Sequence, residues 1–385
     1  MKQILFLFVS FSFLATCWAQ EDTAVEVHIP ATQKYSFTSV IDIEASDVKS
    51  QGNTGTCWSF AGSSFIESEI FKSSGVLIDI SEMYNVRQTY PSKAWNYVMR
   101  QGKTQFSEGG LAHDVLNSIK QYGLVPESAY SGLMTESQKH DHATIVPELQ
   151  KVLDAYIKND KDSNSPNWKF KVDSILNVKL GKIPDNFSYN GLYYNPKSFL
   201  EMTKFDVSNY VTLTSFLQEP FYSQFILNIP DNFSNGIYYN IPLNKLVDAV
   251  DTALKNGYSL ALDCDVSEKT FSSKYGVAVL PKKLDEQEKC LTYIVEESEI
   301  TPEFRQQEFE NYNTTDDHLM HIVGLVKDQN NNEYYKIKNS WGGNSDRIGN
   351  DGYVYMSKPF FKLKTISVTV NKKGLPDTLK KDLKI

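Results

Sequence analysis

A cysteine stands where a turn-rich stretch of the sequence meets an apolar one. Residues 51–60 read QGNTGTCWSF, so glycines and threonines precede Cys57, and large aromatic residues follow it. The segment from Cys57 onward has no proline before Gly75 and carries apolar residues on successive turns, which predicts a helix over residues 57–74. At the first position of a helix, unpaired N–H groups and the positive end of the helix dipole favour a thiolate nucleophile. A buried structural cysteine is the alternative for such a residue on its own.

Later residues fit the partners that a thiol nucleophile needs. A general base and acid is required, and histidine is the residue most often used. His321 lies in an alternating apolar run that predicts a strand, with His318 three residues before it as the rival. Asn339 follows a second strand-like run eighteen residues after His321, where its side chain can orient an imidazole as the third member of a triad. Trp341 can shield that hydrogen bond from water. A core histidine bonded to a backbone carbonyl is the alternative for His321.

Together with the segment NSWGG at residues 339–343, these residues resemble the papain family of cysteine peptidases. Gln51, six residues before Cys57, falls where this family has its oxyanion-hole glutamine. The resemblance implies that the Gln51 amide and the Cys57 backbone N–H hold the developing oxyanion. It also favours His321 over His318, because the family's histidine is followed by apolar strand residues. The implied catalytic set is therefore Cys57, His321, Asn339 and Gln51.

Departures from papain itself point to the bleomycin hydrolase or aminopeptidase C branch. Thr54 and Thr56 stand where the papain signature has Cys and Ser or Ala, and Cys57 and His321 lie 264 residues apart, beyond the roughly 130–150 of that signature. Only 37 residues separate the predicted start of the mature chain from Cys57, too few for a papain-type propeptide. The segments EGG at 108–110 and QYGLVPE at 121–127 are similar to motifs of the same branch.

The branch implies a substrate cleft and a gate. Gly109 and Gly110 line the cleft, where missing side chains admit a peptide backbone, and Trp341 borders it. The carboxylate of Ile385, at the end of a C-terminal tail in the cleft, meets the free amine of the substrate, which gives aminopeptidase action on peptides. A frayed, charged tail is the alternative for residues 377–385. A papain-like endopeptidase with an open cleft and an inactive binding protein on the same fold are the competing functions. The hexameric ring of the family is the homo-oligomer that the resemblance implies.

Elements that position these residues follow from the remaining patterns. Helices are expected at 57–74, 82–100, 112–122, 147–158, 167–180 and 243–256. Strands are expected at 258–264, 275–280, 319–326, 334–339, 353–356 and 365–370. Helices before strands indicate an α+β protein, and the resemblance makes it a papain-like two-lobe fold, with a central nucleophile helix, an antiparallel barrel-like lobe and a largely helical insertion.

The expected organisation divides the chain into five parts. They are a signal peptide (1–19), an N-terminal part with the nucleophile helix (20–130), a mostly helical insertion (131–257), a β-rich lobe with the catalytic His and Asn (258–371) and the C-terminal tail (372–385). Within the insertion the hexapeptide IPDNFS at 183–188 recurs at 229–234. Two copies are too few for a repeat fold, so we interpret them as similar turns.

Bulk properties exclude some function classes. Of the 385 residues, 41% are hydrophobic, which is enough for a large core in two lobes. A net charge of -8, with no basic stripe interleaved with aromatic residues, argues against nucleic acid as a partner. No Cys-x-x-Cys pair occurs, so we expect no metal site, and no motif calls for a cofactor.

The N-terminus predicts export. Lys2 precedes an apolar run at residues 4–15, and the small residue Ala19 follows, as in a secretory signal peptide. We expect cleavage near Ala19 and a periplasmic or extracellular protein, since the run is too short to span a bilayer. A lipid on Cys17 and a buried N-terminal helix are the alternatives. The mature chain keeps three cysteines, and a bridge between Cys264 and Cys290 is left open.

Overall fold

A computed structural model describes residues 34–135, 139–158 and 167–385. The signal peptide expected at 1–19 lies outside these residues.

The helices of the described residues are α1 (Cys57–Ser74), α2 (Glu82–Met99), α3 (Ala112–Tyr122), α4 (Ile145–Ile157), α5 (Trp168–Leu180), α6 (Pro196–Thr203), α7 (Leu243–Lys255), α8 (Pro302–Glu310), α9 (Lys358–Lys364) and α10 (Asp377–Leu383). Their strands are β1 (Thr38–Asp42), β2 (Phe187–Tyr189), β3 (Leu192–Tyr194), β4 (Tyr210–Thr214), β5 (Gln224–Ile226), β6 (Ile237–Asn240), β7 (Leu260–Cys264), β8 (Phe271–Ser272), β9 (Val277–Ala278), β10 (His318–Lys327), β11 (Glu333–Lys338), β12 (Tyr353–Ser357) and β13 (Thr365–Asn371).

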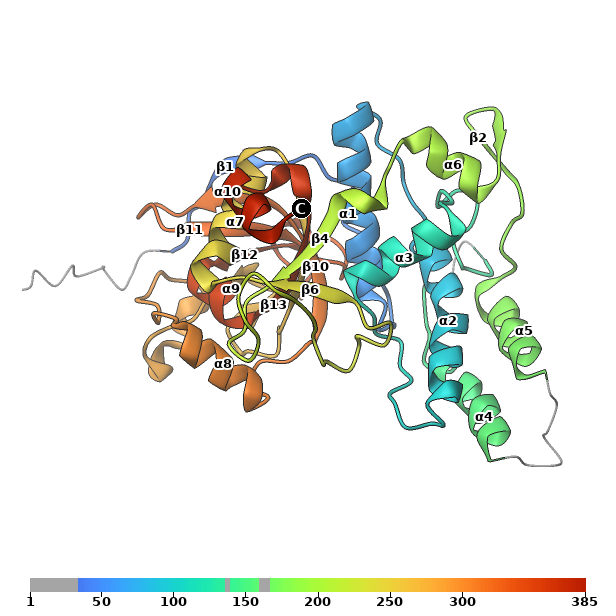
Figure 1. The fold of residues 1–385 in the computed structure, drawn as a ribbon. Coiled ribbons are helices and arrows are strands. Elements are labelled where there is room, and N and C mark those ends of the chain that lie inside the picture. Colours follow the sequence, from blue (N-terminus) through green and yellow to red (C-terminus); the bar gives the residue numbers. More distant parts are fainter. Residues whose placement is uncertain (1–33, 136–138, 159–166) are drawn as a thin grey trace, which may run out of the picture.

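Helix α1 stands between a helical side and a sheet side (Figure 1). It is buried along nearly its whole length, as expected for a helix that other elements surround. Small residues on it permit close packing: a Cβ on Gly62 would press against the Val115 side chain of α3. The helix ends at Gly75, whose φ of 71° is left-handed and whose N–H bonds the Phe71 carbonyl.

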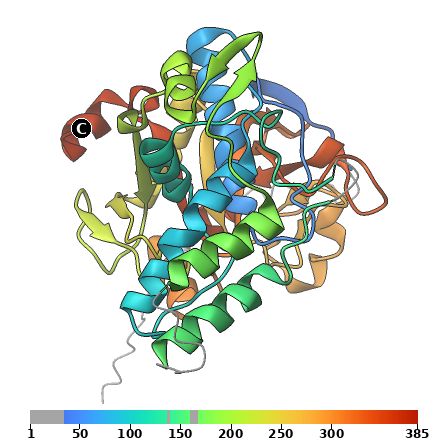
Figure 2. The same cartoon turned by 90° about the vertical axis from the view of Figure 1, so that its right-hand side faces the viewer.

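The helical side packs around α2. Ser81 caps this helix, since its hydroxyl accepts a hydrogen bond from the Tyr84 N–H at 3.0 Å. Helices α4 and α5 lie beside α2 in Figure 2 and bury Leu149, Leu153 and Leu176 in the same core as α1. This core holds the nucleophile helix from one side.

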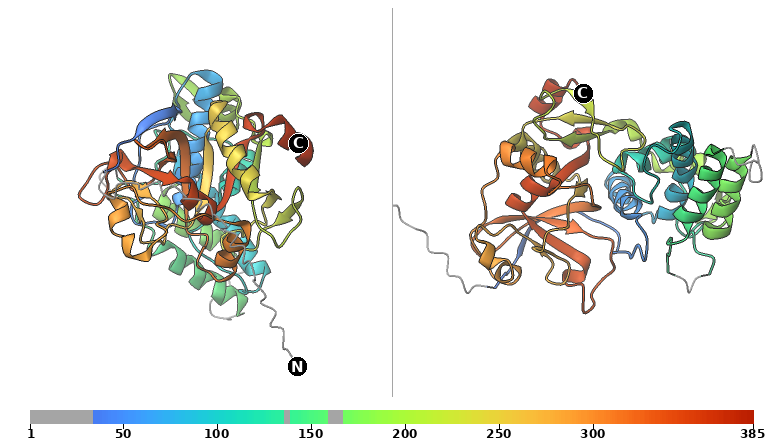
Figure 3. Two further views of the ribbon diagram at one scale, coloured as in Figure 1. Left: turned by 90° about the vertical axis from the view of Figure 1, so that its left-hand side faces the viewer. Right: turned by 90° about the horizontal axis from the view of Figure 1, so that it is seen from below.

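The sheet side holds the other core. Among the described residues, an 11-stranded sheet runs β5-β6-β4-β13-β7-β10-β11-β12-β9-β8, and β1 pairs with β10. Strand β10 lies against α1, with β7 and β11 as antiparallel neighbours. The right-hand view of Figure 3 shows this side apart from the helical side. The arrangement confirms the predicted α+β, papain-like two-lobe fold.

Residues 131–257, which the sequence predicts to be a largely helical insertion, contain α4, α5, α6 and α7 and also several short strands. Their second half supplies β4, β5 and β6, and β4 pairs with β13 so that these strands extend the main sheet. The loop between β5 and β6 then returns toward the helical side. The insertion therefore contributes to both sides of the molecule.

The structure also bears on a possible disulfide and on membrane-spanning helices. Cys57, Cys264 and Cys290 are free and buried, so the bridge left open between Cys264 and Cys290 is not formed. Over the described ranges, no helix is long and apolar enough to cross a membrane.

Candidate active site

Cys57 is the first residue of α1. Its side chain is 8% exposed, and the sulfur accepts a hydrogen bond from the Leu319 backbone N–H of β10. The indole N–H of Trp58 donates to the Glu108 carbonyl at 3.0 Å, which ties the start of the helix to the loop before Gly109. The thiol thus lies against the peptide group that directly follows His318.

His318 begins β10 and is the histidine that contacts Asn339. Its Nε2 lies 2.8 Å from Asn339 Oδ1, an oxygen that also accepts from the Ser340 N–H at 2.7 Å. The Trp341 ring stacks on the His318 ring, with 4.8 Å between centroids and 29° between planes. Because Asn339 engages Nε2, Nδ1 is the nitrogen that remains to exchange a proton with Cys57.

His321 does not make the contact that the sequence predicts for it. It lies three residues from His318 in a regularly paired part of β10, so the two rings leave opposite faces of the strand. Its Nδ1 lies 2.9 Å from the Ser64 hydroxyl, which in turn accepts from Lys338 Nζ at 2.8 Å. Burial and the charge of Lys338 hold the pKa of His321 well below its usual range. The structure therefore corrects the choice of His321: the ring oriented by Asn339 is His318.

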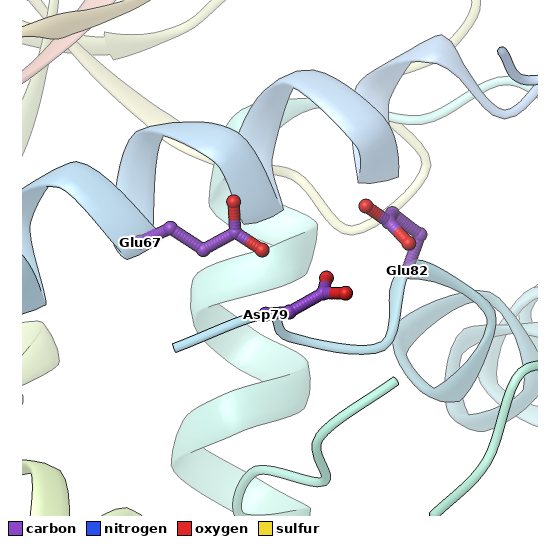
Figure 4. Close-up of side chains that lie close together, drawn as sticks. All are labelled: Glu67, Asp79 and Glu82. Atoms are coloured by element: carbon purple, nitrogen blue, oxygen red, sulfur yellow. The ribbon is translucent and has the colours of Figure 1, made fainter. Parts of the chain in front are cut away.

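A polar cluster of Lys49, Glu67, Asp79 and Glu82 lies behind His321. Figure 4 shows the three carboxylates facing one another from α1, the following loop and the start of α2, and one oxygen from each lies within 4.8 Å of the others. Lys49 Nζ is 2.5 Å from Asp79 and 2.8 Å from Glu82. Its ammonium supplies the positive charge that a metal ion would bring, so we assign no metal chemistry to the cluster.

Burial governs the charge state of the thiol and the imidazole. It raises the pKa of Cys57 to about 12, opposed by the Leu319 N–H and reinforced by the charges of Asp316, Asp231 and Asp263. It lowers the pKa of His318 to about 4, although the bond to Asn339 works in the other direction. The helix start acts in the opposite direction to burial, because its unpaired N–H groups and dipole favour a thiolate. A neutral imidazole is the form that accepts the thiol proton, so the two charges would form together as a pair.

Gln51 is held by Ser340, the residue that follows Asn339. Its Oε1 accepts from the Ser340 hydroxyl at 2.6 Å, and its backbone N–H bonds the Ser340 carbonyl at 2.8 Å. One proton of Nε2 goes to the Thr54 carbonyl at 2.7 Å. Within the described part of the chain, the second proton has no partner. The amide is therefore fixed in place with one donor to spare.

Gly109 and Gly110 lie close to other groups. A Cβ on Gly110 would stand 3.0 Å from the Trp58 indole, and a Cβ on Gly109 would collide with the carboxylate of Asp231. Lys93 Nζ donates to the Gly109 carbonyl and, at 2.8 Å, to the Ser107 carbonyl. Both glycines were expected to admit a substrate backbone, but beside Gly109 there is a carboxylate instead of open space.

The C-terminal tail lies away from Cys57. Gly374 accepts a hydrogen bond from Asn256, whose own carbonyl accepts from Lys72 near the last turn of α1. An 18-residue helix is about 27 Å long, so this contact lies at the far end of α1 from Cys57. The tail continues as α10, with Leu379 buried and Ile385 packed on the core of the sheet side. The expected place of Ile385 in the cleft is therefore wrong, because its apolar side chain and those of α10 are part of a core.

Sequence reasoning missed Asp231 and left His318 as the rival. No local pattern marks Asp231, because the hexapeptide around it also occurs at residues 183–188, where Asp185 is exposed. Leu379 and Leu383 are four residues apart, a spacing that places them on one face of a helix and could have identified α10.

Comparisons with known proteins identify the family of the chain. The family model described as the Peptidase C1-like family matches residues 96–385. Aminopeptidase C of Listeria monocytogenes is 24% identical over 90% of this chain and 86% of its own length. Bleomycin hydrolase of Gallus gallus is 21% identical over 94% of this chain and 88% of its own length.

A solved structure shares the fold. The crystal structure of PepW from Lactobacillus rhamnosis superposes with a TM-score of 0.71 at 19% identity and covers 90% of this chain and 84% of its own. At that identity the likeness concerns the fold alone.

Proposed function

The chain belongs to the Peptidase C1-like family and is a cysteine peptidase, and from this premise we propose that it removes residues from the free N-termini of peptides, with Cys57 as nucleophile and His318 as base. The observation that carries the assignment of the machinery is the hydrogen bond between His318 and Asn339 under the Trp341 ring, next to the buried thiol. The aminopeptidase activity is supported by relatives that are named aminopeptidases.

The proposed reaction uses each of these groups in turn. The Cys57 sulfur attacks the carbonyl carbon of the first peptide bond while its proton passes to His318 Nδ1. The imidazolium then gives this proton to the departing amine as the carbon–nitrogen bond breaks. Water, with its proton taken by His318, attacks the resulting thioester, and the amino acid leaves as Cys57 regains its proton. Asn339 holds the ring so that Nδ1 faces the sulfur throughout.

The proposed oxyanion hole consists of the spare Nε2 proton of Gln51 and the backbone N–H of Cys57. The contacts of Gln51 with Ser340 and Thr54 support this role, because a donor that is already fixed needs no reorganisation when charge develops. Trp341, stacked on His318, would keep water from the bond between His318 and Asn339.

An endopeptidase is the second candidate, favoured by the position of the tail. Since Ile385 packs on the core of the sheet side, it does not close the cleft. The cleft of an endopeptidase would have to be open beside Gly109, where the carboxylate of Asp231 lies. This contact supports the aminopeptidase.

One experiment separates the two candidates. The purified protein is incubated with a peptide that has a free N-terminus and with its N-acetylated form, and the product masses are followed over time. An aminopeptidase shortens the free peptide one residue at a time and spares the acetylated one. Internal fragments from both peptides would establish the endopeptidase instead, and Cys57→Ala serves as the inactive control.

We also propose that the protein is exported, which rests on the sequence at residues 1–19. Mass spectrometry of the protein from its native host is expected to find a mature N-terminus at or near Gln20 outside the cytoplasm. Retention of residues 1–19, or a lipid on Cys17, would contradict the proposal.

A further inference from the structure

The loop between β5 and β6, residues 227–236, crosses from the sheet side to the helical side and is called the crossing loop here. Its own side chains shape it: buried Asn232 donates to the Leu227 carbonyl at 2.8 Å and accepts from the Gly236 N–H at 2.7 Å. The Ser234 hydroxyl docks it on α3, with 2.6 Å to Asp114 Oδ1 and 3.0 Å to His113 Nε2. The loop is therefore anchored at both ends of its path.

Asp231 is the residue that this loop presents to the cleft. Its Oδ1 accepts from Gln105 Nε2 at 3.0 Å and from the Ser107 hydroxyl at 3.3 Å. Its Oδ2 lies against Gly109, at the place that a side chain would otherwise fill. Within the described residues Oδ2 has no hydrogen-bond partner. One oxygen thus fixes the carboxylate, and the other remains available.

Two more carboxyl groups border the same space. The backbone N–H of Asp231 donates to the carboxylate of Asp316, two residues before His318. Asp263 pairs with Leu319 across β7 and β10, so its strand position is next to the peptide group that contacts Cys57. Asp263 is 3% exposed, and its carboxyl group interacts directly with that of Asp316. Burial raises the pKa of Asp263 well above its usual range, and the charges of Asp316 and Asp231 raise it further.

Positive charge is scarce around these carboxyl groups. Lys93 is the base whose charge acts on Asp231, but its ammonium is already bonded to the carbonyls of Ser107 and Gly109. Buried carboxylates without cationic partners are expensive, and proteins keep such groups where a ligand brings the missing charge. Three carboxyl groups whose charges act on the Cys57 thiol fit a cationic part of the substrate.

We propose that Asp231, backed by Asp316 and Asp263, binds the α-ammonium group of the substrate's first residue. This inference rests on the proposed aminopeptidase function and names the group that selects for free N-termini. In such a substrate the ammonium is two bonds from the carbon that Cys57 attacks. It therefore lies close to the carboxyl groups whose charges act on the Cys57 thiol. Oδ2 of Asp231 accepts one ammonium proton, and the negative charge of the neighbouring Asp263–Asp316 carboxyl pair adds to the attraction.

The position of Asp231 has a second consequence. A peptide extended beyond its first residue would have to run beside Gly109, where the Asp231 carboxylate stands. The crossing loop therefore both attracts a free amine and blocks a longer chain. This is the selectivity that was first expected of Ile385.

The chain contains a matched control for testing this role. The hexapeptide IPDNFS that holds Asp231 also occurs at residues 183–188, where Asp185 is the corresponding aspartate and is exposed. Asp231→Asn keeps the shape of the side chain and an oxygen for Gln105 but removes the charge. Asp185→Asn makes the same chemical change in the same local sequence, away from the cleft.

The test measures kcat/KM on aminoacyl amidomethylcoumarins, each with a free and an acetylated amine, using the residue that the wild type cleaves best. For Asp231→Asn we expect a roughly ten- to hundredfold loss on the free-amine substrate, mainly through KM, since an ammonium left without its acceptor loses a charged hydrogen bond. Cleavage of the acetylated substrate should be unchanged, Asp185→Asn should match the wild type, and Asp231→Ala should gain activity on acetylated substrates.

Other outcomes overturn the inference. If Asp231→Asn cleaves the free-amine substrate as well as the wild type does, another group binds the amine. An equal loss on both substrates would give Asp231 a structural role only. If the wild type itself prefers the acetylated substrates, the proposed aminopeptidase function fails first, and the role of Asp231 falls with it.

Discussion

The C-terminal helix is expected to stabilise the fold without controlling substrate choice. Leu379 and Leu383 are 3% and 6% exposed in the core of the sheet side. Removing a buried leucine side chain lowers the free energy of unfolding by about 2–5 kcal/mol, since apolar burial is lost and a cavity remains. Leu379→Ala should therefore shift the urea midpoint of unfolding clearly downward. Lys381→Ala, at an exposed position of the same helix, should change the free energy of unfolding by less than about 0.5 kcal/mol.

The same variants test whether the tail is a gate. Urea titration gives the stability, and cleavage of free and acetylated peptides gives the selectivity of the folded fraction. We expect Leu379→Ala to keep the wild-type ratio of the two rates, because α10 lies at the far end of α1 from Cys57. Our reasoning is refuted if deletion of residues 379–385 leaves stability intact and releases activity on acetylated peptides. That result would place the tail in the cleft.

Three further predictions concern the site and its surroundings. His318→Ala should reduce peptide hydrolysis by several orders of magnitude, whereas His321→Gln should keep the chemistry and lose only stability; the reverse pattern in kcat would contradict the triad. Gln51→Ala should lower kcat by roughly 10²–10³ with a measurable remainder, and an unchanged kcat would remove Gln51 from the oxyanion hole. Burial raises the pKa of Glu69 from 4.5 to about 7. The stability that protonated Glu69 contributes to the fold is therefore fully present below pH 4.5 and is lost as the pH rises to 7. Glu69→Gln should therefore flatten the decrease of stability over that window, by about 3 kcal/mol at most, and an unchanged slope in urea titrations at pH 4.5 and 7 would contradict the shift.

Local signals predicted the elements that carry the site. The helices at 57–74 and 112–122 agree with α1 and α3 at both ends, because Gly75 and Gly123 with positive φ follow them. Strands 319–326 and 334–339 agree with β10 and β11 to within a residue at each end, since alternation and turn residues mark them. These elements carry Cys57 and His318, and Asn339 directly follows β11, so the segments that form the candidate site were recognisable in the sequence.

The remaining features depend on contacts between distant segments. His318 and His321 lie in the same strand-like run, and only the pairing of β10 with its neighbours decides which ring faces Asn339. Strand β4 is short and is stabilised by pairing with β13, more than 150 residues later. Asp231 meets Gly109 across 122 residues of chain. No local pattern encodes such contacts, because they form between segments that are far apart in the sequence.

The most direct test of the central claim is the site and rate of covalent labelling by two aminoacyl chloromethyl ketones, one with a free amine and one acetylated. Peptide mapping by mass spectrometry identifies the alkylated cysteine, whose sulfur displaces chloride from the reagent. We predict that the free-amine reagent labels Cys57 rapidly and the acetylated reagent slowly. His318→Ala should suppress this labelling, and His321→Gln should not. Labelling of Cys57 at equal rates by both reagents, or labelling that persists in His318→Ala, would contradict the account.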